Sequence, residues 1–151
     1  MNGAPQKRPR VLIAVAPGAV RQVSIALGDA FDCTLVDTVE TGIQRLGAGS
    51  FDLLVVGYFL DNSHPFRLIT EAKARSPRTP ILLVRALPLS LGRTGEADIR
   101  AAYRELGVAE FLNFQRDIEL LGVEEAQRLF RRLALSLLHP ESRAGPPLGA
   151  P

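Results

Sequence analysis

Short apolar segments alternate with amphipathic helical patterns along most of this chain. Apolar runs of strand length cover residues 10–16, 32–36, 51–56, 80–84 and 110–114. Apolar residues spaced three or four positions apart predict helices over residues 17–28, 38–47, 65–75, 96–106 and 123–138. Strands that alternate with helices pair in parallel and are covered on both faces, so the pattern predicts an α/β, doubly wound fold.

The predicted strands are nearly all apolar, which is typical of a parallel sheet buried on both faces. Right-handed crossovers leave few topologies, and 2-1-3-4-5 is the commonest strand order at this size. We therefore expect a flavodoxin-like, five-stranded parallel sheet in one domain over residues 10–138. Residues 1–9 and 139–151 are expected to be disordered tails, the second because it is rich in proline and glycine.

Local signals mark helix ends and inward-facing positions. Pro17 suits a first helical turn, Asp37 or Thr38 can cap the second helix, and Gly107 can end the fourth. The spacing of apolar residues also predicts which side chains face the core, among them Phe66, Ile69, Tyr103 and Leu106.

Composition and charge narrow the class of protein. Hydrophobic residues make up 46% of the 151 residues and charged residues 23%, which is ordinary for a globular domain. The 18 cationic residues are mostly scattered, so direct nucleic-acid binding is not expected. No apolar run approaches the roughly 20 residues that span a bilayer. The single cysteine, Cys33, excludes an intramolecular disulfide, and a reducing, bacterial-type cytoplasm is the expected location.

The carboxyl ends of the predicted strands, where a doubly wound sheet gathers its ligands and catalytic groups, carry few reactive side chains. The first strand leads into Ala16 and Pro17, the third into Gly57 and the fourth into Arg85, and the fifth ends at Phe114. The clustered carboxylates that a hard cation such as Mg²⁺ needs are missing from these positions. No strand end supplies a nucleophile with a base, so we expect no enzyme, no metal and no other cofactor.

Three apolar segments carry a resemblance to a known family. They are residues 51–56 (Phe-Asp-Leu-Leu-Val-Val), 79–84 (Thr-Pro-Ile-Leu-Leu-Val) and 106–112 (Leu-Gly-Val-Ala-Glu-Phe-Leu). Together with the order and spacing of the elements from residue 10 to residue 138, they resemble the receiver domain of two-component response regulators, the CheY-like superfamily. The resemblance implies a role in bacterial signal transduction.

The same resemblance implies which reactive positions this chain has lost. Ala16 and Pro17 stand where receivers have the acids that hold Mg²⁺, and Gly57 stands at the phosphoacceptor aspartate. Arg85 replaces the hydroxyl residue of the fourth strand, and Phe114 replaces the lysine of the fifth. Because these positions are lost together, we expect a degenerate pseudo-receiver: a non-catalytic, phosphorylation-independent module for signalling through protein–protein contacts.

An alternative hypothesis keeps the former phosphorylation pocket as a binding site. Arg85 needs an anion, a carbonyl or water, because burying an unpaired cation is costly. Asp61 is one candidate partner and would make an internal salt bridge. A small ligand or anion bound by Asp61, Ser63, His64 and Arg85 is the other.

A partner surface is expected around the fourth helix, the fifth strand and the fifth helix, because receiver-like domains commonly act through that face. The candidate contact residues are Leu87, Leu89, Leu91, Tyr103 and Phe111. The alternative that the leucines tuck under the fourth helix stays open. Phe111 stands at the family's aromatic switch position, where loss of the phosphoryl group implies a fixed core residue. The expected partner is another signalling protein or a second copy of the chain in a homodimer.

Overall fold

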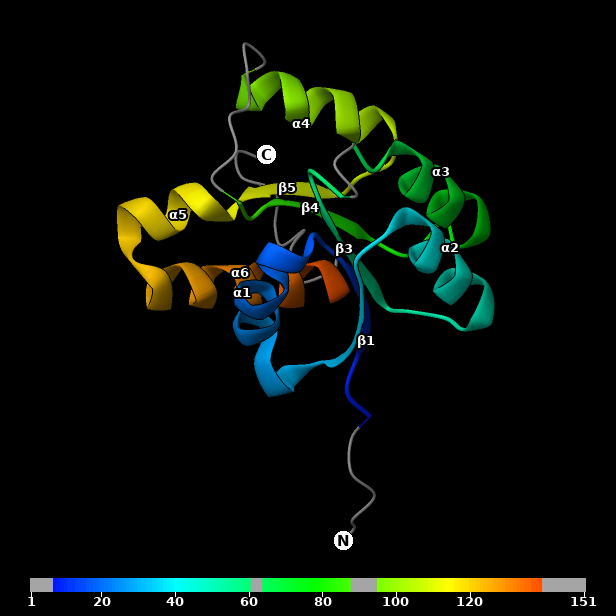
Figure 1. The fold of residues 1–151 in the computed structure, drawn as a ribbon, viewed down its shortest axis with the longest axis horizontal. Helices are drawn as coiled ribbons and strands as arrows, with labels where there is room; N and C mark the ends of the chain where they lie inside the picture. The colour runs from blue at the N-terminus through cyan, green and yellow to red at the C-terminus, as the bar shows by residue number, and fades with distance from the viewer. Residues whose placement is uncertain (1–6, 61–63, 88–94, 140–151) are drawn as a thin grey trace, which may run out of the picture.

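The computed structural model describes residues 7–60, 64–87 and 95–139. Its five strands are β1 (Arg10–Ala14), β2 (Asp32–Val36), β3 (Leu53–Gly57), β4 (Ile81–Arg85) and β5 (Glu110–Asn113). All pair in parallel, in the order β2-β1-β3-β4-β5. The predicted α/β doubly wound fold and its strand order are therefore confirmed (Figure 1).

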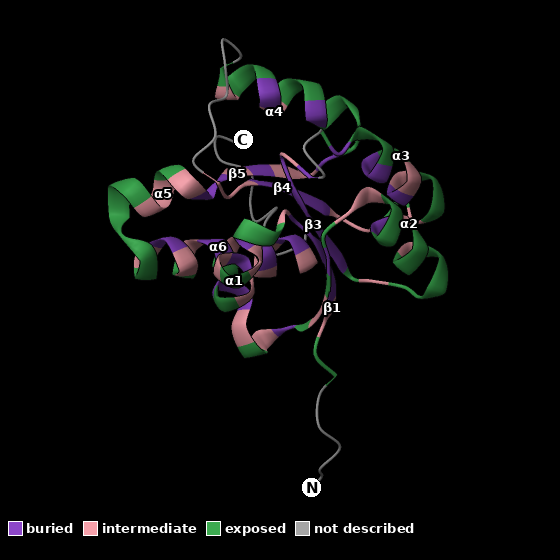
Figure 2. Ribbon diagram, viewed as in Figure 1, coloured by how far each residue is buried: buried purple, intermediate pink, exposed green. Residues whose placement is uncertain are grey.

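Helices cover both faces of this sheet (Figure 1). They are α1 (Pro17–Leu27), the 3-10 turn η1 (Gly28–Ala30), α2 (Val39–Ala48), α3 (Phe66–Arg75), α4 (Glu96–Glu105), α5 (Phe114–Leu121) and α6 (Val123–Leu138). The core on one face is built with α1, α5 and α6, and the core on the other with α2, α3 and α4. Buried residues concentrate along the central strands (Figure 2), which explains why their sequences are nearly all apolar.

The local helix signals act as predicted. Pro17 is the first residue of α1. The Thr38 hydroxyl caps α2 by accepting a hydrogen bond of 3.0 Å from the backbone N–H of Thr41. Gly107 follows α4 with a φ of 100°, a left-handed conformation that favours glycine, and so reverses the chain toward β5.

Helix α5 was not predicted from the sequence, which had assigned Phe114 to the fifth strand. The strand ends one residue earlier because the side chain of Asn113 starts a helix: its Oδ1 accepts a hydrogen bond of 3.1 Å from the N–H of Arg116. Phe114 then faces the core as the first residue of α5, completely buried and in edge-to-face contact with Phe130 at 5.0 Å.

Two predicted core residues lie at the surface. Phe66 is 47% exposed, and Leu68 is buried in the same helix together with the correctly predicted Ile69. Phe66 begins α3 and stacks on Tyr103 rather than entering the core. Leu106 is 36% exposed because it follows the last residue of α4, where the helical spacing no longer holds.

The ends of the domain lie close to the predicted boundaries. The carbonyl of Pro9 accepts a hydrogen bond of 2.8 Å from the N–H of Asp32, so the chain is tied to the sheet just before β1. Residues 1–6 and 140–151, most of the two expected tails, lie outside the described residues. Among the helices of the described part, none is long and apolar enough to cross a membrane.

Replacing Phe130 by alanine should lower the free energy of unfolding by about 3–5 kcal/mol, because it removes a fully buried ring and its contact with Phe114. The matched control is Phe66→Ala, which trims a half-exposed ring and should cost only about 1 kcal/mol. Urea denaturation followed by circular dichroism measures both. Equal losses for the two variants would contradict this placement of the core.

Candidate functional site

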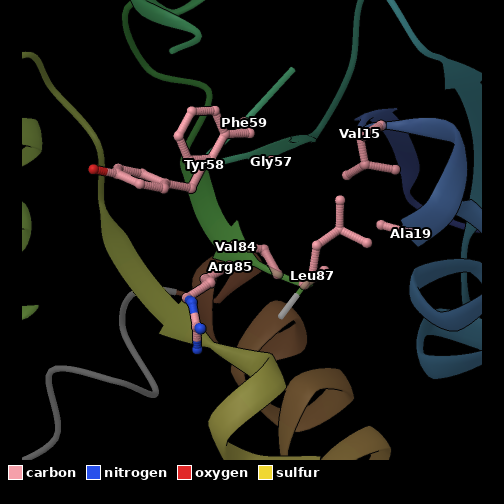
Figure 3. A pocket seen from close by; sticks show the side chains of 10 residues that line it. Val15, Ala19, Gly57, Tyr58, Phe59, Val84, Arg85 and Leu87 are labelled. Atoms are coloured by element: carbon pink, nitrogen blue, oxygen red, sulfur yellow. The ribbon is translucent and has the colours of Figure 1, made fainter. Parts of the chain in front are cut away.

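A small pocket lies at the carboxyl ends of β1, β3 and β4, next to the point where the strand order reverses (Figure 3). It is lined by Val15, Ala16, Ala19, Gly57, Tyr58, Phe59, Val84, Arg85, Ala86 and Leu87. About 20 Å³ is open to the centre of a water molecule, which is room for about one water.

The structure brings together three of the five residues predicted at this pocket. Ala16, Gly57 and Arg85 line it, as the positions of the strand ends require. Pro17 is exposed at the start of α1 and is not part of the lining. Phe114 lies in the core between the sheet and α6, so its assignment to the pocket was wrong. Residue 114 leaves the sheet because α5 begins there.

Gly57 ends β3 at a position where the backbone is closely approached. A Cβ atom at this residue would lie 3.0 Å from the carbonyl oxygen of Phe59 and 3.5 Å from the Cα of Val15. The loop after β3 is also held against β4, because the N–H of Tyr58 donates a 2.8 Å hydrogen bond to the carbonyl of Val84. Any side chain at residue 57 therefore requires this loop to move.

Leu87 closes the pocket from the β4 side. Its side chain lies opposite Val15 and Ala19, while that of Arg85 points away from them (Figure 3). Leu87 is half-buried and packs against the core shared with α1, with its Cδ2 3.4 Å from the Cβ position of Gly18. From the sequence, Leu87 was expected either at a partner surface or under α4. Its contact with the start of α1 carries no signal in the sequence.

Arg85 joins a polar network that links three elements. Its Nη1 donates a 3.0 Å hydrogen bond to Oδ1 of Asn113 at the end of β5. The Nδ2 of Asn113 in turn donates a 3.0 Å hydrogen bond to Glu96 at the start of α4. Asn113 is the buried polar residue of the described chain, at 6% exposure, and both ends of its amide are used. This network was not predicted.

Glu96 is the acidic centre of the network. It forms ion pairs with Arg100 at 3.2 Å and with Arg116 at 3.0 Å, and Arg100 also pairs with Glu110 at 2.5 Å. Burial opposes the ionised form of Glu96. The hydrogen bonds from Asn113 and Arg100 and the two arginine charges outweigh burial, so the pKa of Glu96 lies below its ordinary value.

The residues proposed for anion binding are only partly described. Asp61 and Ser63 lie outside the described residues, so the Arg85–Asp61 salt bridge and the four-residue anion site stay predictions. His64 is exposed, and its ring contacts those of Tyr58 at 4.8 Å and Phe59 at 4.9 Å. These contacts give His64 a packing role at the surface of the loop.

Two residues proposed for the partner surface are buried. Tyr103 is 3% exposed and Phe111 is 2% exposed, so neither side chain is available to a partner. Both pack in the core on the α4 face, where their rings lie within 6.3 Å of Tyr58. The fixed core position expected for Phe111 agrees with this packing. Leu89 and Leu91 lie outside the described residues.

The residues that the structure describes contain no group of three or more histidine, cysteine, aspartate or glutamate side chains placed to hold a metal ion.

Neither a protein-family model nor a curated protein matches the sequence.

Solved structures of receiver domains share the fold. The phosphorylated cyanobacterial phytochrome response regulator RcpA matches with a TM-score of 0.65 and 14% sequence identity, over 89% of this chain and 96% of that one. The CheY-like receiver domain protein from Methanospirillum hungatei matches with a TM-score of 0.65 and 13% identity, over 91% and 100%. The Mn²⁺-bound response regulator Rcp1 matches with a TM-score of 0.63 and 14% identity, over 87% and 95%.

These matches identify the fold of the chain. The chain has the CheY-like receiver fold, with the same five-stranded parallel sheet in the order 2-1-3-4-5. At such low sequence identity the likeness establishes the fold alone, and function has to be argued from the residues of this chain.

Gly57→Ala should destabilise the protein by about 1–2 kcal/mol, because the new methyl group meets the Phe59 carbonyl at 3.0 Å. Gly18→Ala is the matched control on the opposite side of the pocket. Its methyl group would make an ordinary 3.4 Å contact with Leu87, so this change should be neutral or stabilising by up to about 1 kcal/mol. Thermal and urea denaturation measure both, and a stabilised Gly57→Ala variant would refute the close approach.

Glu96→Gln should lower the free energy of unfolding by about 1–2 kcal/mol at pH 7, because it removes the charge between Arg100 and Arg116. Because the pKa of Glu96 is lowered in the folded state, its ionised carboxylate stabilises the fold at pH values above its ordinary pKa of 4.5. This stabilisation is lost as the pH falls from 4.5 through the lower pKa of the folded state. The difference between wild type and variant should therefore shrink from pH 6 toward pH 3. Urea denaturation at several pH values tests this, and a constant difference would contradict it.

Proposed function

We propose that this chain is a phosphorylation-independent, receiver-like signalling module that acts through protein contacts and catalyses no reaction. Its partner is another signalling protein or a second copy of the chain. The observation that carries the proposal is the lining of the strand-end pocket: Gly57, at the expected acceptor position, has no side chain and is closely approached by the Phe59 carbonyl, and Leu87 packs beside it.

The chemistry of the pocket supports this proposal. RcpA was solved in phosphorylated form and Rcp1 with Mn²⁺ bound. Transfer of a phosphoryl group to a receiver requires a carboxylate acceptor and a metal ion to neutralise the transferred charge. In this chain the same sheet edge presents Ala16, Gly57 and an arginine, so the acceptor carboxylate is missing from its position.

The polar network supports a fixed, rather than switched, output. Hydrogen bonds from Arg85 through Asn113 to Glu96 tie the ends of β4 and β5 to the start of α4. A rearrangement of these elements would separate a buried amide from both of its partners, which costs about 1–3 kcal/mol for each group left unsatisfied. The surface over the ends of β4 and β5 and the start of α4 is therefore available to a partner without covalent modification of the chain.

Beryllofluoride with Mg²⁺, a mimic of the phosphorylated state, should leave the protein unchanged. We expect the amide chemical shifts of residues around Gly57 and Arg85 to stay in place in ¹H–¹⁵N spectra, because the pocket offers no carboxylate to coordinate the mimic. A receiver domain that retains its acceptor aspartate, treated in parallel, is the positive control. Saturable shift changes at the ends of β3 and β4 would overturn the proposal.

A further inference from the structure

Three apolar side chains are exposed at the corner where α5 meets α6. Leu120 is 72% exposed, Leu121 is 50% exposed and Val123 is 43% exposed. The corner stands out from the body of the domain (Figure 1), and its surface is exposed (Figure 2). Single exposed apolar residues are ordinary, but a cluster on a projecting corner indicates a contact surface. We call Leu120, Leu121 and Val123 the apolar corner.

The apolar corner is flanked by negative charge. Glu119 accepts a 2.9 Å hydrogen bond from Gln115, which leaves its charge unneutralised. Glu124 is exposed and forms no ion pair within the described residues. Glu125, in the first turn of α6, is neutralised by Arg128 at 2.5 Å. A partner for this corner therefore needs apolar surface next to positive charge.

The same chain carries a groove of that kind. An open groove of about 760 Å³ runs between α1, η1, the outer edge of the sheet at β2, and α6. Ile25 and Leu35 line it and are 49% and 45% exposed, although both are apolar. Phe31 and Cys33 continue the apolar lining. We call this the edge groove.

Positive charge borders the edge groove. The Nε of Arg131 donates to the carbonyl of Ala26 at 2.9 Å, and Arg8 donates to the carbonyl of Asp29 at 3.4 Å. Both arginines line the groove, and neither pairs with a carboxylate within the described residues. Asp29 adds one negative charge to this lining, which remains net positive.

We propose that the apolar corner of one copy docks in the edge groove of a second copy. Leu120 and Leu121 then cover Ile25 and Leu35, which removes four exposed apolar side chains from water. Glu119 and Glu124 come to face Arg8 and Arg131 at the rim, in keeping with their complementary charges.

The geometry of this contact determines the assembly. The corner and the groove are different surfaces, so a single contact leaves one corner and one groove free on the pair. These free surfaces either engage each other in a closed ring of two or more copies or bind further copies in an open chain. This inference does not rest on the proposed loss of phosphorylation, because neither surface contains a residue of the pocket at the strand ends.

Sedimentation velocity on the full chain over a concentration series tests the proposal. The average mass should rise with concentration above that of a monomer and should fall again as salt is added. Leu120→Ser and Ile25→Ser should each abolish self-association. Because each of these variants keeps one intact surface, mixing them should give a 1:1 heterodimer and nothing larger. Leu106→Ser, at an exposed leucine outside both surfaces, is the matched control and should assemble like wild type.

Charge reversal tests the rim contacts separately. Arg8→Glu and Glu124→Arg should each weaken assembly about 3- to 10-fold, and the variant that carries both should recover most of the loss. Circular dichroism confirms that each variant is folded. A protein that stays monomeric up to about 1 mM would overturn the proposal. So would a mixture of Leu120→Ser and Ile25→Ser that fails to associate.

Discussion

The close approach of the Phe59 carbonyl to Gly57 is the constraint on which the rest of the site depends. Since a Cβ atom would lie only 3.0 Å from that oxygen, a side chain at residue 57 would require the loop over the end of β3 to shift by a few tenths of an ångström. The loop is then held to β4 through Tyr58 and Val84. With the loop in this place, the pocket at the strand ends has room for about one water.

The remaining pocket residues follow from this closure. Leu87 gains apolar contacts with α1 in a space that would otherwise be wet and charged. Arg85 directs its guanidinium to Asn113 at the end of β5. Through Asn113 the arginine is coupled to Glu96, whose lowered pKa keeps the network charged near neutral pH. Packing and hydrogen bonding thus hold the ends of β4 and β5 and the start of α4 together.

The fold could be predicted from sequence because the apolar runs of β1, β3 and β4 are buried strands, and parallel strands leave few topologies. The five strand ends placed Ala16, Gly57 and Arg85 at one edge for the same reason. Helix α5 was missed because Phe114 continues an apolar run, and the cap that ends this run is the side chain of Asn113. The contact of Leu87 with Gly18 and the link from Asn113 to Glu96 join distant segments, and no local pattern encodes them.

On the function proposed above, the strand-end pocket takes no phosphoryl group. Incubation of the full chain with acetyl phosphate and Mg²⁺, followed by intact-mass spectrometry, measures this directly. A receiver with its acceptor aspartate serves as the positive control for the phosphodonor. Because the pocket lining has no acceptor carboxylate, we expect an unmodified mass under conditions that phosphorylate the control. Stoichiometric gain of one phosphoryl group, mapped to an aspartate of this chain, would contradict the account.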